Sequence, residues 1–181
     1  MPRDAWKLLA SQLVSHHVIF SLHHDRYRVE PSGREQDFVR LDAPDWVNVV
    51  PLTDDGQVVF IRQYRHGIRD VTLEVPGGIV DPGESPAAAA LRELSEETGY
   101  VADAARELGY VWPNPAIQGN RCYTYLAEGA RAGGVARPDE FERIEVVTYP
   151  LAEVPALLAS GQIRHALVVT AFAMLGVSYP R

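Results

Sequence analysis

The sequence predicts an α/β protein whose mixed β-sheet lies between helical layers, preceded by a small antiparallel β appendage. Short apolar segments with strand-like composition alternate along the chain with helical patterns, which favours a layered α/β arrangement. Residues 1–44 contain shorter, alternating patterns with a turn signal of their own. A chain of 181 residues suits one domain with a small addition. We therefore expect a β appendage at 1–44 and the main domain at 45–181.

The composition excludes some functions. A net charge of −7 argues against a nucleic-acid-binding surface, although a bound metal can still attract a phosphorylated small molecule to an acidic site. The single cysteine, Cys122, cannot form an internal disulfide, and we interpret it as inert packing. The N-terminal stretch is a poor signal peptide, and the longest apolar segment, 166–177, is too short to span a bilayer. We expect a cytoplasmic protein without membrane partners.

The appendage is predicted to contain short strands and one tight turn. The predicted strands are 14–20, 27–29 and 37–41, with the turn at 31–33. Such a small sheet is only marginally stable alone and needs another surface to pack against. Four histidines form two adjacent pairs, His16, His17, His23 and His24. Adjacent side chains on a strand point to opposite faces, so we favour surface or interface histidines over a metal site.

The main domain begins with longer apolar strands. Strands 47–52 and 58–61 flank a turn at 54–56, and strand 71–75 leads into Pro76, Gly77 and Gly78. Proline ends the strand, and the paired glycines allow the backbone to turn tightly beside a ligand.

A helix at 85–98 follows, with Ser85 at its start and Gly99 as its C-cap. Its apolar residues share one face, and three glutamates share the other: Glu93, Glu96 and Glu97. Three carboxylates so close repel by roughly 3–4 kcal/mol per pair. We therefore expect a cation among them. Oxygen ligands favour Mg²⁺, with Mn²⁺ as an alternative.

The remaining segments complete the sheet and the second helical layer. Strands are predicted at 105–112, 121–127 and 144–149, and helices at 151–160 and 164–175. The segment 129–139 has no hydrophobic period and two adjacent glycines, so we expect a mobile loop.

The stretch from Gly78 to Tyr100 resembles the signature of the Nudix hydrolases: Gly, five residues, Glu, seven residues, then Arg-Glu-U-x-Glu-Glu-x-Gly-U, where U is bulky and apolar or aromatic. Every fixed position is filled, by Gly78, Glu84, Arg92, Glu93, Glu96, Glu97 and Gly99. The resemblance implies the Nudix α/β/α sandwich and hydrolysis of a nucleoside diphosphate linked to another group. It further implies Glu93, Glu97 and the Gly77 carbonyl as metal ligands, with Glu96 binding a second metal or orienting water. Arg92 and Glu84 would hold the loop against the helix, and Gly78 and Gly99 would be structural.

Other segments resemble the ADP-ribose and nucleotide-sugar branch of that family. They are Gln63-Tyr64-Arg65, the run 73–78, and Pro115, which lies 16 residues beyond Gly99. The segment 114–118 departs from the loop expected in ADP-ribose enzymes. The run 138–147 resembles a loop whose glutamate approaches the diphosphate, with Glu142 as our first choice and Glu140 as our second.

The same resemblance suggests substrate contacts. Arg65 would reach the diphosphate or terminal sugar, and Glu74 would bind sugar hydroxyls or an arginine of a partner subunit. Arg121 and Asn120 are weaker candidates. Aromatic residues in strands are usually core, but three could stack on a base: Tyr27, Phe38 and Trp46.

These expectations define an Mg²⁺-dependent hydrolase that converts ADP-ribose to AMP and ribose 5-phosphate. The alternative is a GDP-mannose or broad nucleotide-sugar diphosphatase. A nucleoside triphosphate hydrolase leaves the appendage without a role, and a non-catalytic ADP-ribose sensor predicts a degraded signature. The resemblance also implies a homodimer that exchanges its N-terminal segments, each supplying base-binding groups to the partner.

Overall fold

The computed structural model describes residues 5–137 and 143–177. The chain divides into two compact units, which we describe separately. The N-terminal unit comprises Met1–Pro44 and Trp112–Arg121, and the main unit comprises Asp45–Val111 and Cys122–Arg181. In the described ranges, no helix is both long enough and apolar enough to cross a membrane.

The main unit is built on a seven-stranded sheet with the order β12-β5-β4-β10-β9, in which β6 pairs with β5 and β7 with β4. Its strands are β4 (Trp46–Leu52), β5 (Gln57–Arg65), β6 (Asp70–Glu74), β7 (Gly77–Ile79), β9 (Arg106–Val111), β10 (Cys122–Glu128) and β12 (Ile144–Pro150). Strands β4 and β10 run parallel, and the other neighbours run antiparallel. The sheet is therefore mixed, as expected.

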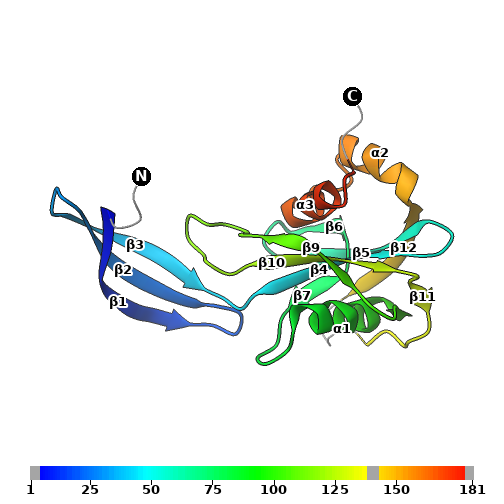
Figure 1. Ribbon diagram of the computed structural model, residues 1–181, viewed down its shortest axis with the longest axis horizontal. Coiled ribbons are helices and arrows are strands. Elements are labelled where there is room, and N and C mark those ends of the chain that lie inside the picture. Colours follow the sequence, from blue (N-terminus) through cyan, green and yellow to red (C-terminus); the bar gives the residue numbers. More distant parts are fainter. Residues whose placement is uncertain (1–4, 138–142, 178–181) are drawn as a thin grey trace. The chain divides into compact units, whose positions relative to one another are not determined.

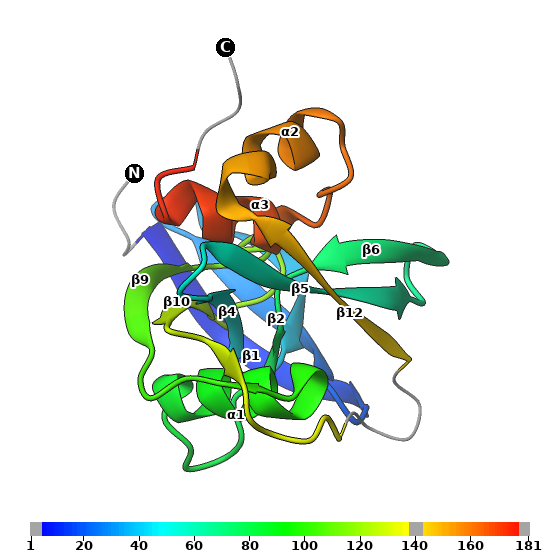
Figure 2. The same cartoon turned by 90° about the vertical axis from the view of Figure 1, so that its right-hand side faces the viewer.

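Helices cover both faces of this sheet (Figures 1 and 2). One face carries α1 (Pro86–Thr98); the other carries the 3₁₀ turn η2 (Leu151–Glu153), α2 (Val154–Ala159) and α3 (Ala166–Met174). Alternation along the strands produces two cores, because Val49 packs in a cluster with Leu94 of α1, whereas Val50 packs in a cluster with Phe172 of α3. The predicted α/β/α sandwich is confirmed.

Helix α1 begins and ends as its sequence predicts. The Ser85 hydroxyl accepts a hydrogen bond from the Ala88 N–H at 3.2 Å. At the other end, Gly99 has φ 71°, and its N–H donates to the Ser95 carbonyl at 2.9 Å. A left-handed residue at this position favours glycine, which explains one fixed glycine of the signature.

The N-terminal unit is a three-stranded antiparallel sheet of β1 (Trp6–His16), β2 (Ser21–Val29) and β3 (Arg34–Asp42). The strands predicted at 27–29 and 37–41 lie within β2 and β3. The strand predicted at 14–20 is correct for residues 14–16 and wrong beyond them: β1 ends at His16, and a turn follows in which the His17 N–H donates to the Phe20 carbonyl at 2.9 Å. Val18, at this turn, is fully exposed.

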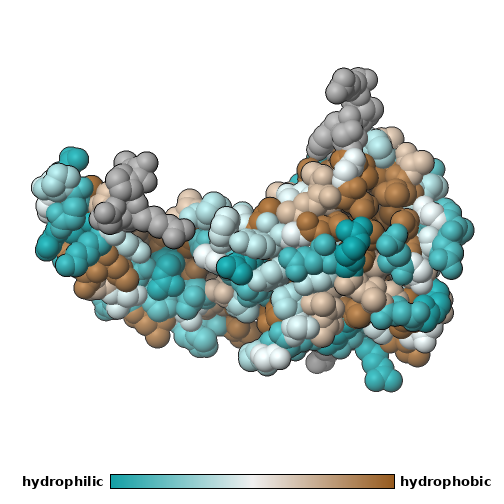
Figure 3. All heavy atoms as spheres, viewed as in Figure 1, coloured by the Kyte–Doolittle hydropathy of each residue, from teal (hydrophilic) through white to brown (hydrophobic). Residues whose placement is uncertain are grey.

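The two faces of this small sheet differ. One face carries exposed ion pairs, Arg26 with Asp37 and Arg28 with Glu35. The other face carries aromatic side chains and Asp25, which is the only buried residue between positions 5 and 44. Figure 3 shows hydrophobic side chains on the surface of this unit between hydrophilic ones.

The segment 129–137 contains more regular structure than its composition suggested. Strand β11 (Arg131–Ala132) pairs with β8 (Tyr100–Val101), which directly follows α1. The expectation of a loop without a strand is therefore wrong for these two residues. The main-chain hydrogen bonds of the segment leave no hydrophobic period in the sequence.

Candidate active site

The glycine turn and α1 meet closely in the main unit. The Gly77 N–H donates to Oε2 of Glu97 at 2.9 Å. A Cβ atom on Gly78 would lie 2.3 Å from Oε1 of Glu93, and one on Gly77 would lie 2.2 Å from the Val47 carbonyl oxygen. Only glycine fits at position 77, where the Cβ would meet backbone, and a Cβ at position 78 would displace the Glu93 carboxylate. The backbone of the turn thus lies directly against the carboxylates of two signature glutamates.

Arg92 holds the charged residues of the signature together. Its guanidinium binds both carboxylate oxygens of Glu84, each at 3.0 Å, and donates to the Ile79 carbonyl at 2.9 Å. The Nη1 group also donates to Glu93 at 2.8 Å and to Glu96 at 2.9 Å. The hydrogen bond from Arg92 lowers the pKa of Glu84 below its ordinary value. One cation therefore links the turn before α1 to two carboxylates on the helix.

The donor set suits a divalent metal, although the side chains are not already arranged as a coordination shell. Glu97 is buried with 4% exposure, and Glu93 and the glycine turn lie beside it. Carboxylate and carbonyl oxygens are the ligands that Mg²⁺ and Mn²⁺ prefer. Across residues 5–137 and 143–177, no three His, Cys, Asp or Glu side chains are grouped closely enough to hold an ion. Binding would require carboxylate oxygens to turn from their present partners.

Arg65 and Glu74 form an ion pair on neighbouring strands. The guanidinium donates to both Glu74 oxygens, at 2.8 and 2.7 Å, and the Thr72 hydroxyl donates to the same carboxylate. Burial alone would raise the pKa of Glu74, but the hydrogen bonds and charge of Arg65 outweigh it, so the pKa is lowered. Arg65 was expected to contact substrate, and Glu74 was expected to bind sugar hydroxyls or an arginine of a partner subunit; in this structure the two residues contact each other.

Four other residues that the sequence suggested for the site lie outside the described residues or in the N-terminal unit. Glu140 and Glu142 lie outside the described residues. Arg121 is exposed and belongs to the N-terminal unit. Asn120, also in that unit, is buried and donates to the Pro44 carbonyl at 3.0 Å. Cys122 is buried in β10, and burial raises the pKa of its thiol to about 12.

Two of the four N-terminal histidines, His16 and His17, have serine hydroxyls as partners. His16 Nδ1 is 2.9 Å from the Ser21 hydroxyl, and His17 Nε2 is 3.0 Å from the Ser15 hydroxyl. Neither interaction brings the two histidine pairs together around one point. Their geometry favours the surface interpretation that the sequence suggested.

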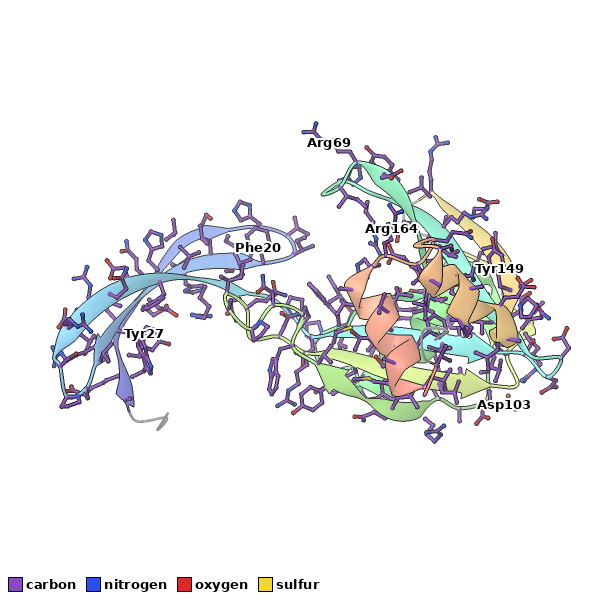
Figure 4. All side chains as sticks on the ribbon, turned by 90° about the horizontal axis from the view of Figure 1, so that it is seen from above. Phe20, Tyr27, Arg69, Asp103, Tyr149 and Arg164 are labelled. Atoms are coloured by element: carbon purple, nitrogen blue, oxygen red, sulfur yellow. The ribbon has the colours of Figure 1, made fainter. Side chains whose placement is uncertain are left out.

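A cavity of about 520 Å³ lies within the N-terminal unit. Its walls include Trp6, Tyr27 and Phe38, whose rings meet edge to face with Phe38 between the other two. Asp25, 2% exposed, accepts hydrogen bonds from the Ser11 hydroxyl at 2.5 Å and from Arg40 Nε at 2.6 Å. The opposite wall is the segment 115–119. Figure 4 labels Tyr27, which lies in β2 of the three-stranded sheet.

Sequence reasoning named Tyr27 and Phe38 but missed Trp6, Asp25 and Arg40. The sequence could have indicated Asp25, because alternation along a strand places Asp25 and Tyr27 on the same face. The contribution of residues 115–119 depends on a long-range contact, in which the Leu41 N–H donates to the Ile117 carbonyl at 2.7 Å. A local sequence pattern does not predict a hydrogen bond between residues so far apart in the chain.

Comparison with known proteins places these features in context. Residues 43–172 match the profile described as the NUDIX domain. The ADP-ribose pyrophosphatase of Bacillus subtilis (strain 168) is 30% identical over 137 residues, covering 75% of this chain and 74% of that protein. The ADP-ribose pyrophosphatase of Mycobacterium tuberculosis is 28% identical over 173 residues, covering 93% of this chain and 82% of its own length. A crystal structure of an ADP compounds hydrolase superposes with a TM-score of 0.84 at 26% identity, covering 94% of this chain and 92% of that one.

Proposed function

This chain belongs to the Nudix family as a pyrophosphohydrolase, and from that membership we propose that it hydrolyses ADP-ribose to AMP and ribose 5-phosphate with Mg²⁺. The convergence of Glu93 and Glu97 on the glycine turn is the observation that carries the metal-dependent chemistry. The choice of ADP-ribose follows relatives with that activity in their names. Hydrolysis of another nucleoside diphosphate sugar, such as GDP-mannose, is the alternative.

We assign the divalent cation to Glu93, Glu97 and the carbonyl of Gly77, with Glu96 as a further carboxylate. When bound, the cation would neutralise charge on the diphosphate and favour attack by water. Arg92 would hold Glu93 and Glu96 in reach of the ion, because it already contacts both. Mn²⁺ would serve in place of Mg²⁺, since it accepts the same oxygen ligands.

In the reaction, the oxygen of water forms a bond to one phosphorus while the bridging P–O bond breaks. The bridging oxygen leaves with the other phosphate, which carries the electron pair away. We propose that Glu142, or failing it Glu140, accepts a proton from the attacking water. Arg65 would turn from Glu74 toward the substrate, where its planar fork suits phosphate oxygens.

For the base, we propose the cavity of the N-terminal unit. Aromatic walls beside an Asp–Arg pair suit a planar heterocycle that has both a π-face and hydrogen-bonding edges. In the exchanged homodimer that we propose, each chain offers this cavity to its partner. Support comes from the exposed apolar side chains of the small sheet: Trp6, Leu8, Leu13, Val14, Phe38 and Val39. A sheet of three strands with so much apolar surface needs a covering partner.

The decisive experiment incubates the protein with Mg²⁺ and a panel of nucleotide sugars and separates the products by chromatography. We expect ADP-ribose to give AMP and ribose 5-phosphate at the highest kcat/KM in the panel. Faster turnover of GDP-mannose would favour the alternative, and no turnover of any diphosphate would refute the enzymatic proposal. Sedimentation tests the dimer separately, since a monomer at all concentrations would end the exchange hypothesis.

Two pairs of variants assign the residues. Glu142→Gln is expected to lower kcat more than Glu140→Gln; the reverse order would transfer the role, and wild-type rates in both would remove it from this loop. Phe38→Ala is expected to raise KM for ADP-ribose by about tenfold through lost stacking. Glu35→Gln, on the other face of the same strand, serves as the control and should leave KM unchanged.

A further inference from the structure

The end of α1 that carries Glu96 and Glu97 is held by a segment outside the signature. Helices leave their last carbonyls without intrahelical donors, and these groups need partners from elsewhere. The Arg137 N–H donates to the Glu96 carbonyl at 2.7 Å. The N–H groups of Gly133 and Gly134 both converge on the carbonyl of Gly99, at 3.2 and 2.9 Å.

The approach of this segment depends on missing side chains. A Cβ atom on Gly133 would lie 2.9 Å from Cγ2 of Val101, and one on Gly134 would lie 3.0 Å from the Ser95 hydroxyl. Neither glycine has a φ angle in the left-handed region. Their backbone conformation is therefore open to other residues, and close contact is what favours glycine here.

The same segment is fixed on its other side. Strand β11 pairs with β8, which continues directly from Gly99, and Arg131 forms an ion pair with Asp103 at 2.6 Å. Figure 4 labels Asp103 in the main unit. Because the ion pair is largely exposed, it adds little, and the main-chain bonds and close packing provide the attachment.

We propose that Gly133 and Gly134 are positioning residues for the carboxylates of Glu96 and Glu97. This inference rests on the proposed metal site and adds to it a clamp, defined as residues 131–137. Glu97 is held at its side chain by the Gly77 N–H, and the clamp holds the backbone of the same turn. Displacing the clamp would release the last turn of α1 and move both carboxylates relative to Gly77.

The test measures Mg²⁺ binding to the full chain by calorimetry, without substrate. The double variant Gly133→Ala/Gly134→Ala places two methyl groups against Val101 and Ser95. We expect it to bind Mg²⁺ about tenfold more weakly, at the lower end of the effect of altering groups that orient metal ligands. kcat should fall with it, and KM should change less.

Matched substitutions decide whether the contacts are the cause. Adding Val101→Ala and Ser95→Ala removes the two atoms that the new methyl groups meet, so Mg²⁺ affinity should recover to within about twofold of wild type. The pair Val101→Ala/Ser95→Ala alone should bind as wild type does. Gly67→Ala is the control for a general glycine effect, because a Cβ there has no atom within 4 Å.

A second comparison keeps the proposal testable if the double glycine variant does not fold. Arg137→Pro removes the N–H that caps the Glu96 carbonyl, whereas Arg137→Ala removes only the side chain. The proline variant should bind Mg²⁺ more weakly than the alanine variant. Equal binding in these two, or wild-type binding by a folded double glycine variant, overturns the positioning role. Absence of Mg²⁺ binding by the wild type would instead refute the metal site itself.

Discussion

The two sheets of this molecule differ in what stabilises them. The seven-stranded sheet of the main unit has helices on both faces, and Val49, Val58 and Phe60 have no exposed surface. In the three-stranded sheet of the N-terminal unit, the only buried residue of the described part is Asp25, a carboxylate held by Arg40 and Ser11. The first sheet contains its own core. The second obtains its order from strand pairing and polar contacts, and its apolar face remains open to a ligand or partner.

This difference predicts where activity and stability reside. Substitutions that remove metal ligands in the main unit should abolish turnover without unfolding it, and substitutions in its core should unfold it. Substitutions in the N-terminal sheet should affect substrate affinity more than they affect the turnover rate or the stability of the main unit. Four measurements test this division, beginning with the largest expected effect.

Glu97→Gln is expected to lower kcat by at least about a hundredfold, beyond the usual effect of groups that only orient metal ligands. The amide keeps the volume of the side chain, so the circular dichroism spectrum should match that of wild type. Near-normal turnover would remove Glu97 from the metal site and weaken the assignment of chemistry to the main unit.

Phe60→Ala is expected to destabilise the main unit by about 3–5 kcal/mol, because Phe60 is fully buried against Tyr149 and Phe172. Phe38→Ala, at a ring that is 40% exposed, should cost about 1 kcal/mol or less. Urea unfolding of both variants gives the two values. Comparable losses would mean that the small sheet has a core as important as the large one.

Arg65→Ala is expected to destabilise the protein by about 1–3 kcal/mol at pH 7, because Glu74 remains buried without its main partner. In wild type the lowered pKa of Glu74 contributes stability above pH 4.5, which is lost as pH falls through the folded value. Without Arg65, burial raises the pKa of Glu74 instead. The loss of unfolding free energy in Arg65→Ala relative to wild type should therefore grow as pH rises from 4 to 7. Urea unfolding across this range measures it.

Arg62→Ala is the matched control on the same strand. Arg62 pairs with the exposed Glu145, and such surface pairs contribute about 0–1 kcal/mol. A deficit as large as that of Arg65→Ala, with the same dependence on pH, would contradict our explanation.

The smallest effect concerns Cys122. Burial raises its pKa to about 12, so the thiol stays protonated near neutral pH and should react with a thiol reagent only after unfolding. Absorbance after addition of the reagent to native and urea-unfolded protein measures this. Rapid labelling of the native form would show that β10 opens more readily than its central place in the sheet suggests.

The sequence was informative where local chemistry determines structure. Ser85 and Gly99 predict both ends of α1, and the spacing of the glutamates predicts its charged face. The family resemblance is confirmed by the profile match over residues 43–172. These features depend on residues within a few turns of one another, which is the range over which sequence patterns act.

The sequence was less informative where distant segments meet. Residues 112–121 join the N-terminal unit through the Leu41–Ile117 and Asn120–Pro44 hydrogen bonds, although they lie far along the chain. The strand and the hydrogen bonds of the clamp were not expected, because they join main-chain groups and leave no pattern in the sequence. The sequence also did not indicate the ion pair between Arg65 and Glu74, because it depends on how β5 and β6 pair in the sheet.

The single guanidinium of Arg92 also has a consequence for how this protein is made. Glutamates that would repel one another in an empty site already have a counter-ion within the chain, contacting Glu84, Glu93 and Glu96. Many small metallo-domains remain unfolded until their ion binds, because the binding free energy is part of their folding free energy. Because Arg92 supplies a positive charge among these carboxylates, we expect the main unit to fold without a bound metal ion.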